Sequence, residues 1–174
     1  MYSNYLEKCE IKVATSRDTS RIIKMLKQVA GWLQDNDIKQ WGFLLEGGDD
    51  VEIEQAISNR ETYIVLSDDD IIATFTLLSK QSDWDKHIWG DDSTSSSLYL
   101  HRLALVPSFM KKGLGNSILI WIQNNNGSVS DYIKLDCIAD NKKLNDFYNK
   151  NNFELIGFND GHNKYQKRLR RPDQ

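Results

Sequence analysis

The sequence predicts an α/β fold, in which a mixed, mostly antiparallel sheet is flanked by helices. Apolar residues alternate or cluster in short segments, as in strands, and recur at helical spacing in the segments between. Along the chain the order is strand, two helices, three strands, helix, strand, helix and two strands. The length of 174 residues suits one domain with a substantial core, so we expect a single domain over residues 1–174.

The first third of the chain predicts one strand and two helices. "IKVAT" (11–15) has β-type composition, and residues 16–36 carry apolar side chains at helical spacing, namely Ile22, Leu26, Val29 and Leu33. Thr15 and Asp18 resemble a capping box at the start of that helix. Residues 51–59 place three apolar side chains on one face and predict a shorter helix.

The remaining elements follow from the same patterns. "TYIVLS" (62–67), "IIATFTLL" (71–78) and "LYLHRLALV" (98–106) predict strands. Residues 80–97 are polar and rich in Ser and Asp, so we expect a long loop or a frayed hairpin there. The C-terminal part predicts a helix, a strand, a second helix and a hairpin, at "GLGNSILIWIQNN", "YIKLDCIA", "NKKLNDFYNKNN" and "FELIGF" with "KYQKRL". In "YIKLDCIA", alternation places Ile133, Leu135 and Cys137 on one face.

The composition excludes several classes of function. The chain carries 22 Lys and Arg against 25 Asp and Glu, a balance that argues against nucleic-acid binding. The N-terminus, "MYSNYLEKCE", has no apolar signal-peptide core, and no segment reaches the roughly 18 apolar residues of a membrane span. We expect a cytoplasmic protein that binds neither nucleic acid nor membrane.

Cysteine and histidine are too scattered to predict a disulfide or a metal site. Cys9 and Cys137 have no metal-ligand spacing, so we expect free thiols in a reducing compartment. The three histidines, His87, His101 and His162, are spread over the chain. We therefore expect no metal.

The segment "FMKKGLGNS" (109–117) combines flexible backbone with positive charge. Gly113 and Gly115 lie in the predicted first turn of a helix, where backbone N–H groups lack helical partners and the helix dipole is positive. Lys111 and Lys112 add formal charge. These features indicate a cradle for a phosphate or pyrophosphate group. The alternative is that the glycines only relieve crowding between a strand and a helix.

Two known phosphate motifs do not match this segment. The chain has no G-x-x-x-x-G-K-[ST] sequence, which excludes a Walker-type nucleotide site. A dinucleotide fingerprint needs a third glycine where the chain has Ile118, and it follows the first strand of a βαβ unit. The segment here follows the fourth predicted strand.

Two segments resemble motifs of the GNAT superfamily of N-acetyltransferases. "LALVPSFMKKGLGNSILIWI" is similar to the acetyl-CoA motif, in which V-x-P ends a strand and [Q/R]-x-x-G-x-[G/A] opens a helix. "NKKLNDFYNKNNF" resembles the later A/N-x-x-x-x-x-F-Y-x-x-x-G-F element. The two lie in the family's order, and the resemblance covers nearly the whole chain. It departs at Met110, which replaces the Gln or Arg, and at Asn152, which replaces a glycine.

The resemblance implies a fold and an activity. The fold would have about six or seven strands and about four helices, with the fourth and fifth strands splayed apart. The activity would be acetyl-CoA-dependent transfer to a primary amine by direct attack in a ternary complex, with coenzyme A as product. The residues that it implies for the cofactor are Leu103, Ala104, Leu105, Lys111, Lys112, Gly113, Leu114, Gly115, Asn116 and Asn141.

Catalytic roles can be assigned to two residues. Tyr148 matches the family's tyrosine, which protonates the leaving thiolate; the alternative is a packing residue. Asn141 can cap its helix as well as bind the pantetheine arm. For the general base, Tyr99, His101 and Leu103 alternate onto one strand face that carries no glutamate, so His101 is the candidate. A structural role for His101 is the alternative, and the weaker candidates are Asp83, Asp85 and His87.

The acceptor and the oligomeric state are less constrained. Trp32, Trp41 and Trp84 lie in regions that commonly form the family's acceptor site, and aromatic faces beside carboxylates suit a cationic amine. Tyr99, on the predicted strand 98–106, is a further candidate for contact with the acceptor. The acceptor can be a small-molecule amine, a polyamine, an amino acid or a peptide amine. A monomer and a homodimer both fit the sequence. A catalytically weak acyl-CoA-binding sensor or interaction module is the alternative function, and a nucleotide-binding module is a third.

Overall fold

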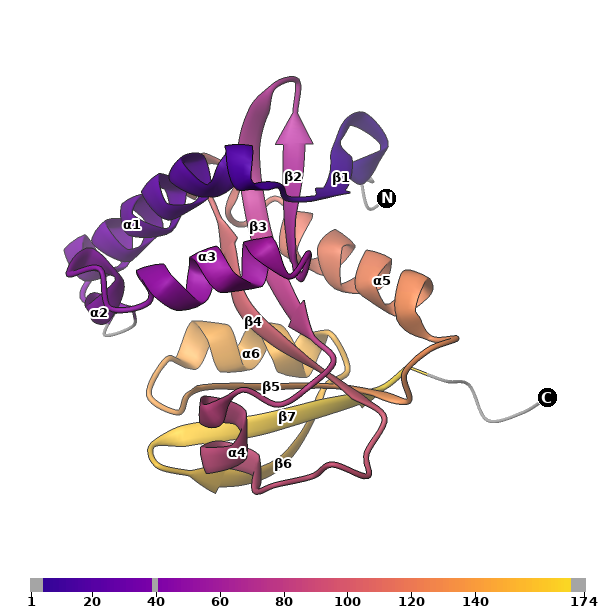
Figure 1. Cartoon of the computed structure of the whole chain (residues 1–174). Coiled ribbons are helices and arrows are strands. Elements are labelled where there is room, and N and C mark those ends of the chain that lie inside the picture. Colours follow the sequence, from indigo (N-terminus) through magenta and orange to yellow (C-terminus); the bar gives the residue numbers. More distant parts are fainter. Residues whose placement is uncertain (1–4, 39–40, 170–174) are drawn as a thin grey trace. The chain divides into compact units, whose positions relative to one another are not determined.

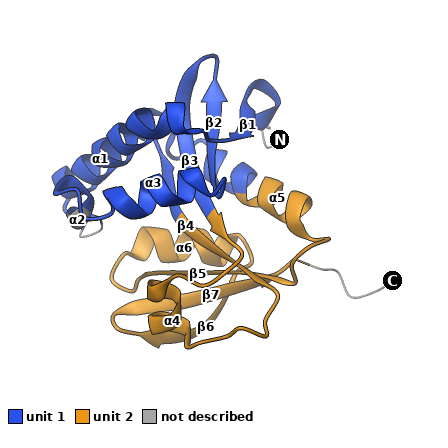
Figure 2. Ribbon diagram, in the orientation of Figure 1, with its two compact units in different colours: residues 1–76, 102–118 blue, residues 77–101, 119–174 orange. Residues whose placement is uncertain are grey.

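The computed structural model describes residues 5–38 and 41–169, which form two compact units (Figure 2). Unit 1 lies within residues 1–76 and 102–118, and unit 2 lies within residues 77–101 and 119–174. The chain therefore passes from one unit to the other three times. A single domain over residues 1–174 stays a prediction.

The strands form a seven-stranded mixed sheet in the order β1-β2-β3-β4-β5-β7-β6 (Figure 1). The pairs β1–β2, β2–β3, β5–β7 and β7–β6 are antiparallel, and β4–β5 is parallel. This topology confirms the predicted fold class. The strands are β1 Glu10–Val13, β2 Thr62–Ser67, β3 Asp70–Leu78, β4 Ser97–Leu105, β5 Tyr132–Ile138, β6 Glu154–Asn159 and β7 His162–Arg168.

Unit 1 contains two of the predicted helices, α1 (Thr19–Asp35) and α3 (Asp50–Ser58). The predicted apolar face of α1 is buried in the core of this unit, as are Ile53 and Ile57 of α3. Asp18 Oδ2 accepts hydrogen bonds from the backbone N–H and the hydroxyl of Thr15 at 2.9 and 3.3 Å, which confirms the expected cap. The sequence did not predict the short helices η1 (Tyr5–Lys8) and α2 (Gly42–Leu45), and the start of the predicted helix over 16–36 is a separate short helix, η2 (Ser16–Asp18).

Unit 2 contains α4 (Asp83–Trp89) and α6 (Lys142–Lys150), which contact opposite faces of β5 and β7. Helix α4 corrects the expectation of a loop or frayed hairpin over 80–97. Its start is fixed by a capping box between Ser82 and Asp85, a signal that the Ser- and Asp-rich composition concealed. We use the term α4 face for the strand residues that contact α4, namely Tyr99, His101, Lys134, Asp136, His162 and Lys164.

The α6 face of unit 2 is organised around the buried side chain of Asn145. Its Oδ1 accepts hydrogen bonds from Tyr165 Oη at 2.7 Å, Asn163 Nδ2 at 2.8 Å and the Cys137 thiol at 3.5 Å. Its Nδ2 donates to the backbone carbonyls of Asn141 and Ile138 at 2.8 and 3.1 Å. The side-chain amide of Asn145 therefore connects the start of α6 to the end of β5 and to β7. The buried position of Cys137 on this side also confirms the predicted apolar face of β5.

The chain closes in the predicted hairpin of β6 and β7. Asp160 and Gly161 form its tight turn, both with positive φ, at 50° and 76°. This left-handed pair is the backbone of a type I′ turn, whose twist suits two antiparallel strands. Among the described residues, no helix has both the length and the apolar character needed to cross a membrane.

Candidate active site

The cradle predicted in unit 1 has an open backbone at the start of α5 (Leu114–Asn126). Gly113 has φ +84°, and a Cβ placed there would meet no atom within 4 Å. Lys111, with φ 61°, and Lys112 are both exposed beside it. The Gly113 carbonyl accepts from Ser117 N at 3.1 Å, so the helix begins at this point. Space, orphan N–H groups and two cations thus coincide, as an anionic group requires.

Met110 occupies the position where the family motif has Gln or Arg. Its side chain is partly buried and packs against the core of unit 1. It therefore contributes to packing in this unit, and the adjacent positive charge comes from Lys111 and Lys112. The ammonium of Lys112 lies 5.7 Å from the centre of the Phe109 ring.

Strand β4 contains one left-handed residue, Arg102, which has φ 49°. A left-handed residue inside a strand marks an irregularity of the bulge type and interrupts the alternation of side chains. The predicted common face of Tyr99, His101 and Leu103 therefore does not continue regularly through Leu103. In unit 1, Arg102 Nη1 lies 3.4 Å from Asp49 Oδ2 and forms an ion pair with it.

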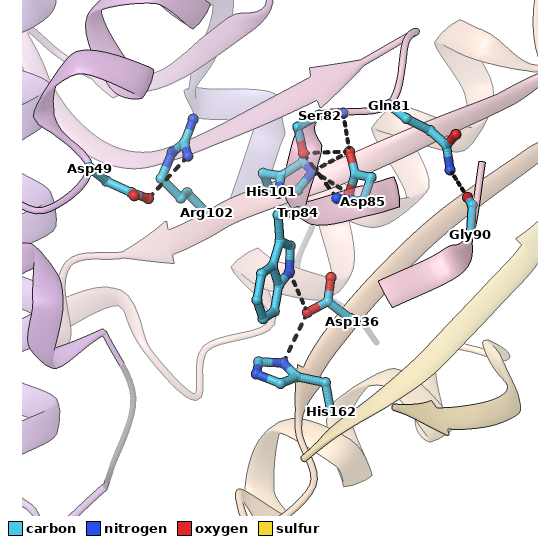
Figure 3. A network of polar contacts seen from close by, with 10 residues as sticks. All are labelled: Asp49, Gln81, Ser82, Trp84, Asp85, Gly90, His101, Arg102, Asp136 and His162. Atoms are coloured by element: carbon cyan, nitrogen blue, oxygen red, sulfur yellow. Dashed lines mark hydrogen bonds and ion pairs between the residues drawn. The ribbon is translucent and has the colours of Figure 1, made fainter. Parts of the chain in front are cut away.

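His101 is held by a buried carboxylate in unit 2 (Figure 3). Its Nε2 lies 2.9 Å from Asp85 Oδ1, and the exposed fractions of the two side chains are 14% and 1%. Asp85 Oδ2 also accepts from Ser82 N and Ser82 Oγ, both at 2.9 Å. Because a carboxylate only accepts, Nε2 carries the hydrogen, and Nδ1 holds the lone pair when the imidazole is neutral. This is the arrangement of an oriented general base.

A second carboxylate, Asp136 of β5, lies on the same α4 face (Figure 3). Its Oδ2 accepts from Trp84 Nε1 at 3.0 Å and lies 2.9 Å from His162 Nδ1. Burial raises the pKa of Asp136, while the Trp84 hydrogen bond and the charges of His162 and His101 act against that rise. The two carboxylates and their histidines therefore form one electrostatic cluster.

Tyr99 lies deeper in the α4 face and is almost completely buried. Its ring packs edge-on against Trp89 with 6.2 Å between centroids. Within the described ranges, the Trp89 N–H is buried without a hydrogen-bond partner, and the Tyr99 hydroxyl forms no well-aligned hydrogen bond, although Gln81 lies close enough to lower its pKa. Burial raises the pKa of Tyr99 to about 12, and the nearby carboxylates of Asp92 and Asp85 add to the rise.

Tyr148 lies on the other side of this sheet, in α6. Its side chain is 5% exposed, and its ring contacts Phe147, Phe153 and Tyr165 at centroid distances of 5.1, 5.5 and 5.9 Å. Burial raises the pKa of the Tyr148 phenol well above its ordinary value. The phenol therefore carries its proton at neutral pH and is a weaker acid than an exposed tyrosine. Asn141 Oδ1 accepts from Leu144 N at 3.1 Å, so Asn141 caps α6.

The four predicted acceptor residues have different surroundings. Trp32 and Trp41 pack against the core of unit 1, which favours a structural role for both. Tyr99 is buried, whereas Trp84 is 40% exposed. Of the weaker base candidates, Asp85 belongs to the buried cluster, Asp83 is exposed, and His87 pairs with Asp160 at an exposed position.

Asp136 was not among the residues predicted to be functional, and Asp85 was only a weaker candidate for the base. Asp136 alternates with Leu135 and Cys137, so its position looks like the solvent face of a strand. It is covered only because α4 packs there, and α4 was not predicted. The Ser82–Asp85 capping spacing was the signal that could have revealed both.

Comparison with known proteins agrees with this fold. No protein-family model matches the chain. It is 34% identical over 158 residues to the uncharacterised N-acetyltransferase YesJ of Bacillus subtilis, which covers 90% of this chain and 88% of that protein. A solved GNAT-family acetyltransferase from Listeria monocytogenes is 28% identical, with a TM-score of 0.80 over 92% of this chain and 94% of that one. The chain therefore belongs to the GNAT family of N-acetyltransferases and is an acyltransferase.

A more distant likeness concerns the fold alone. The PaiA N-acetyltransferase of Thermoplasma acidophilum, solved in complex with coenzyme A, is 16% identical. Its TM-score is 0.71, over 92% of this chain and 98% of that one.

Proposed function

We propose that this enzyme transfers the acetyl group of acetyl-CoA to a primary amine by direct attack, with both substrates bound. The observation that carries the proposal is the His101–Asp85 pair, a shielded imidazole whose proton position is fixed. Such a base has no evident use in a protein that only binds acyl-CoA. The acceptor is a small-molecule amine, a polyamine, an amino acid or a peptide amine.

The start of α5 fits the anionic part of the cofactor, because Gly113 leaves its backbone open and two lysines flank it. We assign the pyrophosphate to the segment Lys111–Asn116. The backbone of Leu103–Leu105 binds the pantetheine arm and donates to the acetyl carbonyl oxygen, and Asn141 binds the arm through its side chain. The coenzyme A in the PaiA complex supports this assignment through the shared fold.

The residues of unit 2 supply the proton transfers. When bound, acetyl-CoA supplies an acetyl group activated as a thioester, with a thiolate as the leaving group. A primary amine has a pKa of about 10.4 and is mostly protonated near neutral pH, so it must lose a proton before it attacks. His101 Nδ1 accepts that proton, and Asp85 stabilises the imidazolium that results. Tyr148 gives its proton to the sulfur.

The direct test is release of free thiol from acetyl-CoA in the presence of a panel of primary amines. We expect amine-dependent thiol release together with the acetylated amine, detected by mass spectrometry. An acyl-CoA-binding module, the alternative, would bind acetyl-CoA in calorimetry without releasing thiol for any amine. That result would refute the proposed reaction and leave the cofactor site intact.

The cofactor site is tested by Gly113→Asp. We expect coenzyme A affinity to fall by at least about tenfold, because a carboxylate there repels the pyrophosphate and fills the open space. The matched control is Gly161→Asp, because Gly161 also has positive φ and open space, with no atom within 4 Å of the place a Cβ would occupy. Calorimetry that found equal coenzyme A affinity in both folded variants would remove the cradle from this segment.

A further inference from the structure

Strands β4 and β5 pair for only a short distance. Within the described chain, their parallel ladder runs from Ser97 and Tyr132 to Tyr99 and Lys134 and then ends. Continuing the same register would bring His101 opposite Asp136, two positions beyond the last pair. Residues in register on parallel strands point to the same side of the sheet, so both side chains project toward α4 where the strands stop pairing. Asp136 therefore sits beside the base, at the opening of the sheet.

The carboxylate of Asp136 is fixed on one side and open on the other. Its side chain is 9% exposed, and both of its contacts, with Trp84 and His162, fall on Oδ2. Among the residues that the structure describes, Oδ1 has no partner. Oδ1 is not among the described buried side-chain atoms that lack a hydrogen-bond partner, so it meets solvent and can accept a further hydrogen bond. A cationic donor is the ligand that a free carboxylate oxygen binds most strongly.

Trp84 adds an aromatic surface next to this carboxylate. Its indole is 40% exposed and contacts the rings of His162 and His87 at centroid distances of 5.0 and 5.6 Å. The hydrogen bond from its Nε1 to Asp136 fixes the orientation of the ring. An exposed indole that is hydrogen-bonded to a carboxylate suits a cation that carries an apolar substituent.

We propose that Asp136 and Trp84 form the acceptor subsite, which selects amines that arrive as ammonium ions. This inference rests on the proposed function. Asp136 Oδ1 accepts one N–H of the ammonium and directs another toward His101 Nδ1, and the alkyl or aryl part of the acceptor lies on Trp84. His101 takes one proton from the ammonium, the nitrogen lone pair forms the C–N bond at the thioester carbonyl, and the C–S bond breaks as Tyr148 protonates the departing sulfur. The second proton that the nitrogen loses passes through solvent to the Tyr148 phenolate, and His101 later releases the first one to solvent. The substrate class is aliphatic amines, and arylamines, which are neutral at neutral pH, are excluded.

The test uses two probes of similar shape, benzylamine and aniline, of which only benzylamine is an ammonium ion at neutral pH. We expect calorimetry at neutral pH to show benzylamine binding that Asp136→Asn weakens by about tenfold or more, as for a lost charge-assisted hydrogen bond. Trp84→Leu should weaken it about threefold. Asp160→Asn is the matched control: it also removes a carboxylate paired with a histidine beside α4, but an exposed one, and should change nothing.

Several outcomes would overturn the assignment. Wild-type protein that does not bind benzylamine, or that binds aniline equally well, would do so. An unchanged benzylamine affinity in folded Asp136→Asn would also do so. If Asp136→Asn fails to fold, the Trp84→Leu affinity and the benzylamine preference of the wild type decide. Amine-dependent thiol release that persists with aniline would retain the transferase reaction while removing this subsite, so the two failures are distinguishable.

Discussion

The two faces of the unit 2 sheet differ in how completely their polar groups are paired. On the α6 face, one amide, Asn145, is hydrogen-bonded at both its oxygen and its nitrogen. On the α4 side, the hydroxyl of Tyr99 in β4, the N–H of Trp89 in α4 and Nδ1 of His162 in β7 are buried without an aligned hydrogen bond in the described part of the chain. Strands β5 and β7 contribute to both faces, and β4 adds Tyr99 and His101 to the α4 face.

This difference in hydrogen bonding suggests different roles for the two faces: the α6 face stabilises the fold, and the α4 face takes part in catalysis. A polar group whose donors and acceptors are all paired holds elements together, and it has no hydrogen-bonding capacity left for a ligand. An underpaired face costs folding free energy, and proteins tolerate that cost at functional sites. The comparison predicts that substitutions on the α4 face impair turnover, whereas substitutions at Asn145 impair folding.

The largest expected effect is that of His101→Gln. Loss of the base should lower kcat by about 10³-fold, within the usual range for a positioned acid or base. The free energy of unfolding should change much less, because the Asp85 carboxylate keeps its bonds from Ser82. Single-turnover rates and urea unfolding measure the two quantities.

Asp85→Asn and His87→Gln complete that experiment. Asp85→Asn leaves the imidazole in place without its orienting charge, so its pH–rate profile should shift while acetyl-CoA affinity stays constant. His87→Gln removes an exposed histidine and should behave as wild type. If kcat fell equally in His101→Gln and His87→Gln, the buried position of His101 on the α4 face would not be important for catalysis.

The second effect tests the α6 face. Asn145→Ala removes the acceptor of Tyr165 Oη and Asn163 Nδ2 and one of the hydrogen bonds to each of two backbone carbonyls, so we expect the free energy of unfolding to fall by about 3 kcal/mol. Urea denaturation measures it. Asn159→Ala is the control, because Asn159 also donates to two backbone carbonyls but at more exposed positions. A loss below about 1 kcal/mol for Asn145→Ala would contradict its role as an anchor.

Tyr148→Phe tests an exception to this comparison. Tyr148 lies on the α6 side of the sheet, which we link to stability, but it is assigned a role in proton transfer. The ring contacts remain and only the proton donor is lost. We expect kcat to fall about 10²-fold, at the low end for general acids, because a thiolate is already a fair leaving group. Acetyl-CoA affinity should stay nearly constant. A wild-type rate in single-turnover assays would leave Tyr148 as a packing residue.

The smallest effect is spectroscopic. The phenolate absorbance that is lost in Tyr99→Phe should titrate near pH 12 in the folded protein and near the ordinary value of about 10 in urea. Because the folded pKa is the higher one, this group's contribution to stability is complete below the unfolded value and is lost as the pH rises through the folded value. Titration of Tyr99 near pH 10 in the folded state would mean that the hydroxyl is hydrated.

Long elements with periodic apolar residues were predictable from the sequence. Which strand faces are covered by helices in the tertiary structure was not. The face of α1 with Ile22 and Leu26, the Thr15–Asp18 cap and the closing hairpin each rest on contacts between near neighbours in the sequence. Helix α4 has seven residues, of which only Asp85 and Ile88 are buried, too few for a periodic signal.

The candidate site follows the same division. The open backbone at Gly113 was predictable because spacing and charge lie within one short segment. The network of Asp85, His101 and Asp136 joins a helix to two strands that are distant in sequence, so no local pattern encodes it. The alternation that made Asp136 look exposed was correct, but the sequence did not reveal that a helix covers that side of the strand.

The three passages of the chain between the units also bear on synthesis of the protein by the ribosome. Unit 1 needs residues 102–118, so the nascent chain completes it only after the first part of unit 2 has emerged. Unit 2 then waits for β7, which pairs with both β5 and β6 and ends at Arg168. At about 5–20 residues per second, most of the chain spends seconds without its final partners. A premature stop codon before β7 would leave unit 2 without the strand that joins two others.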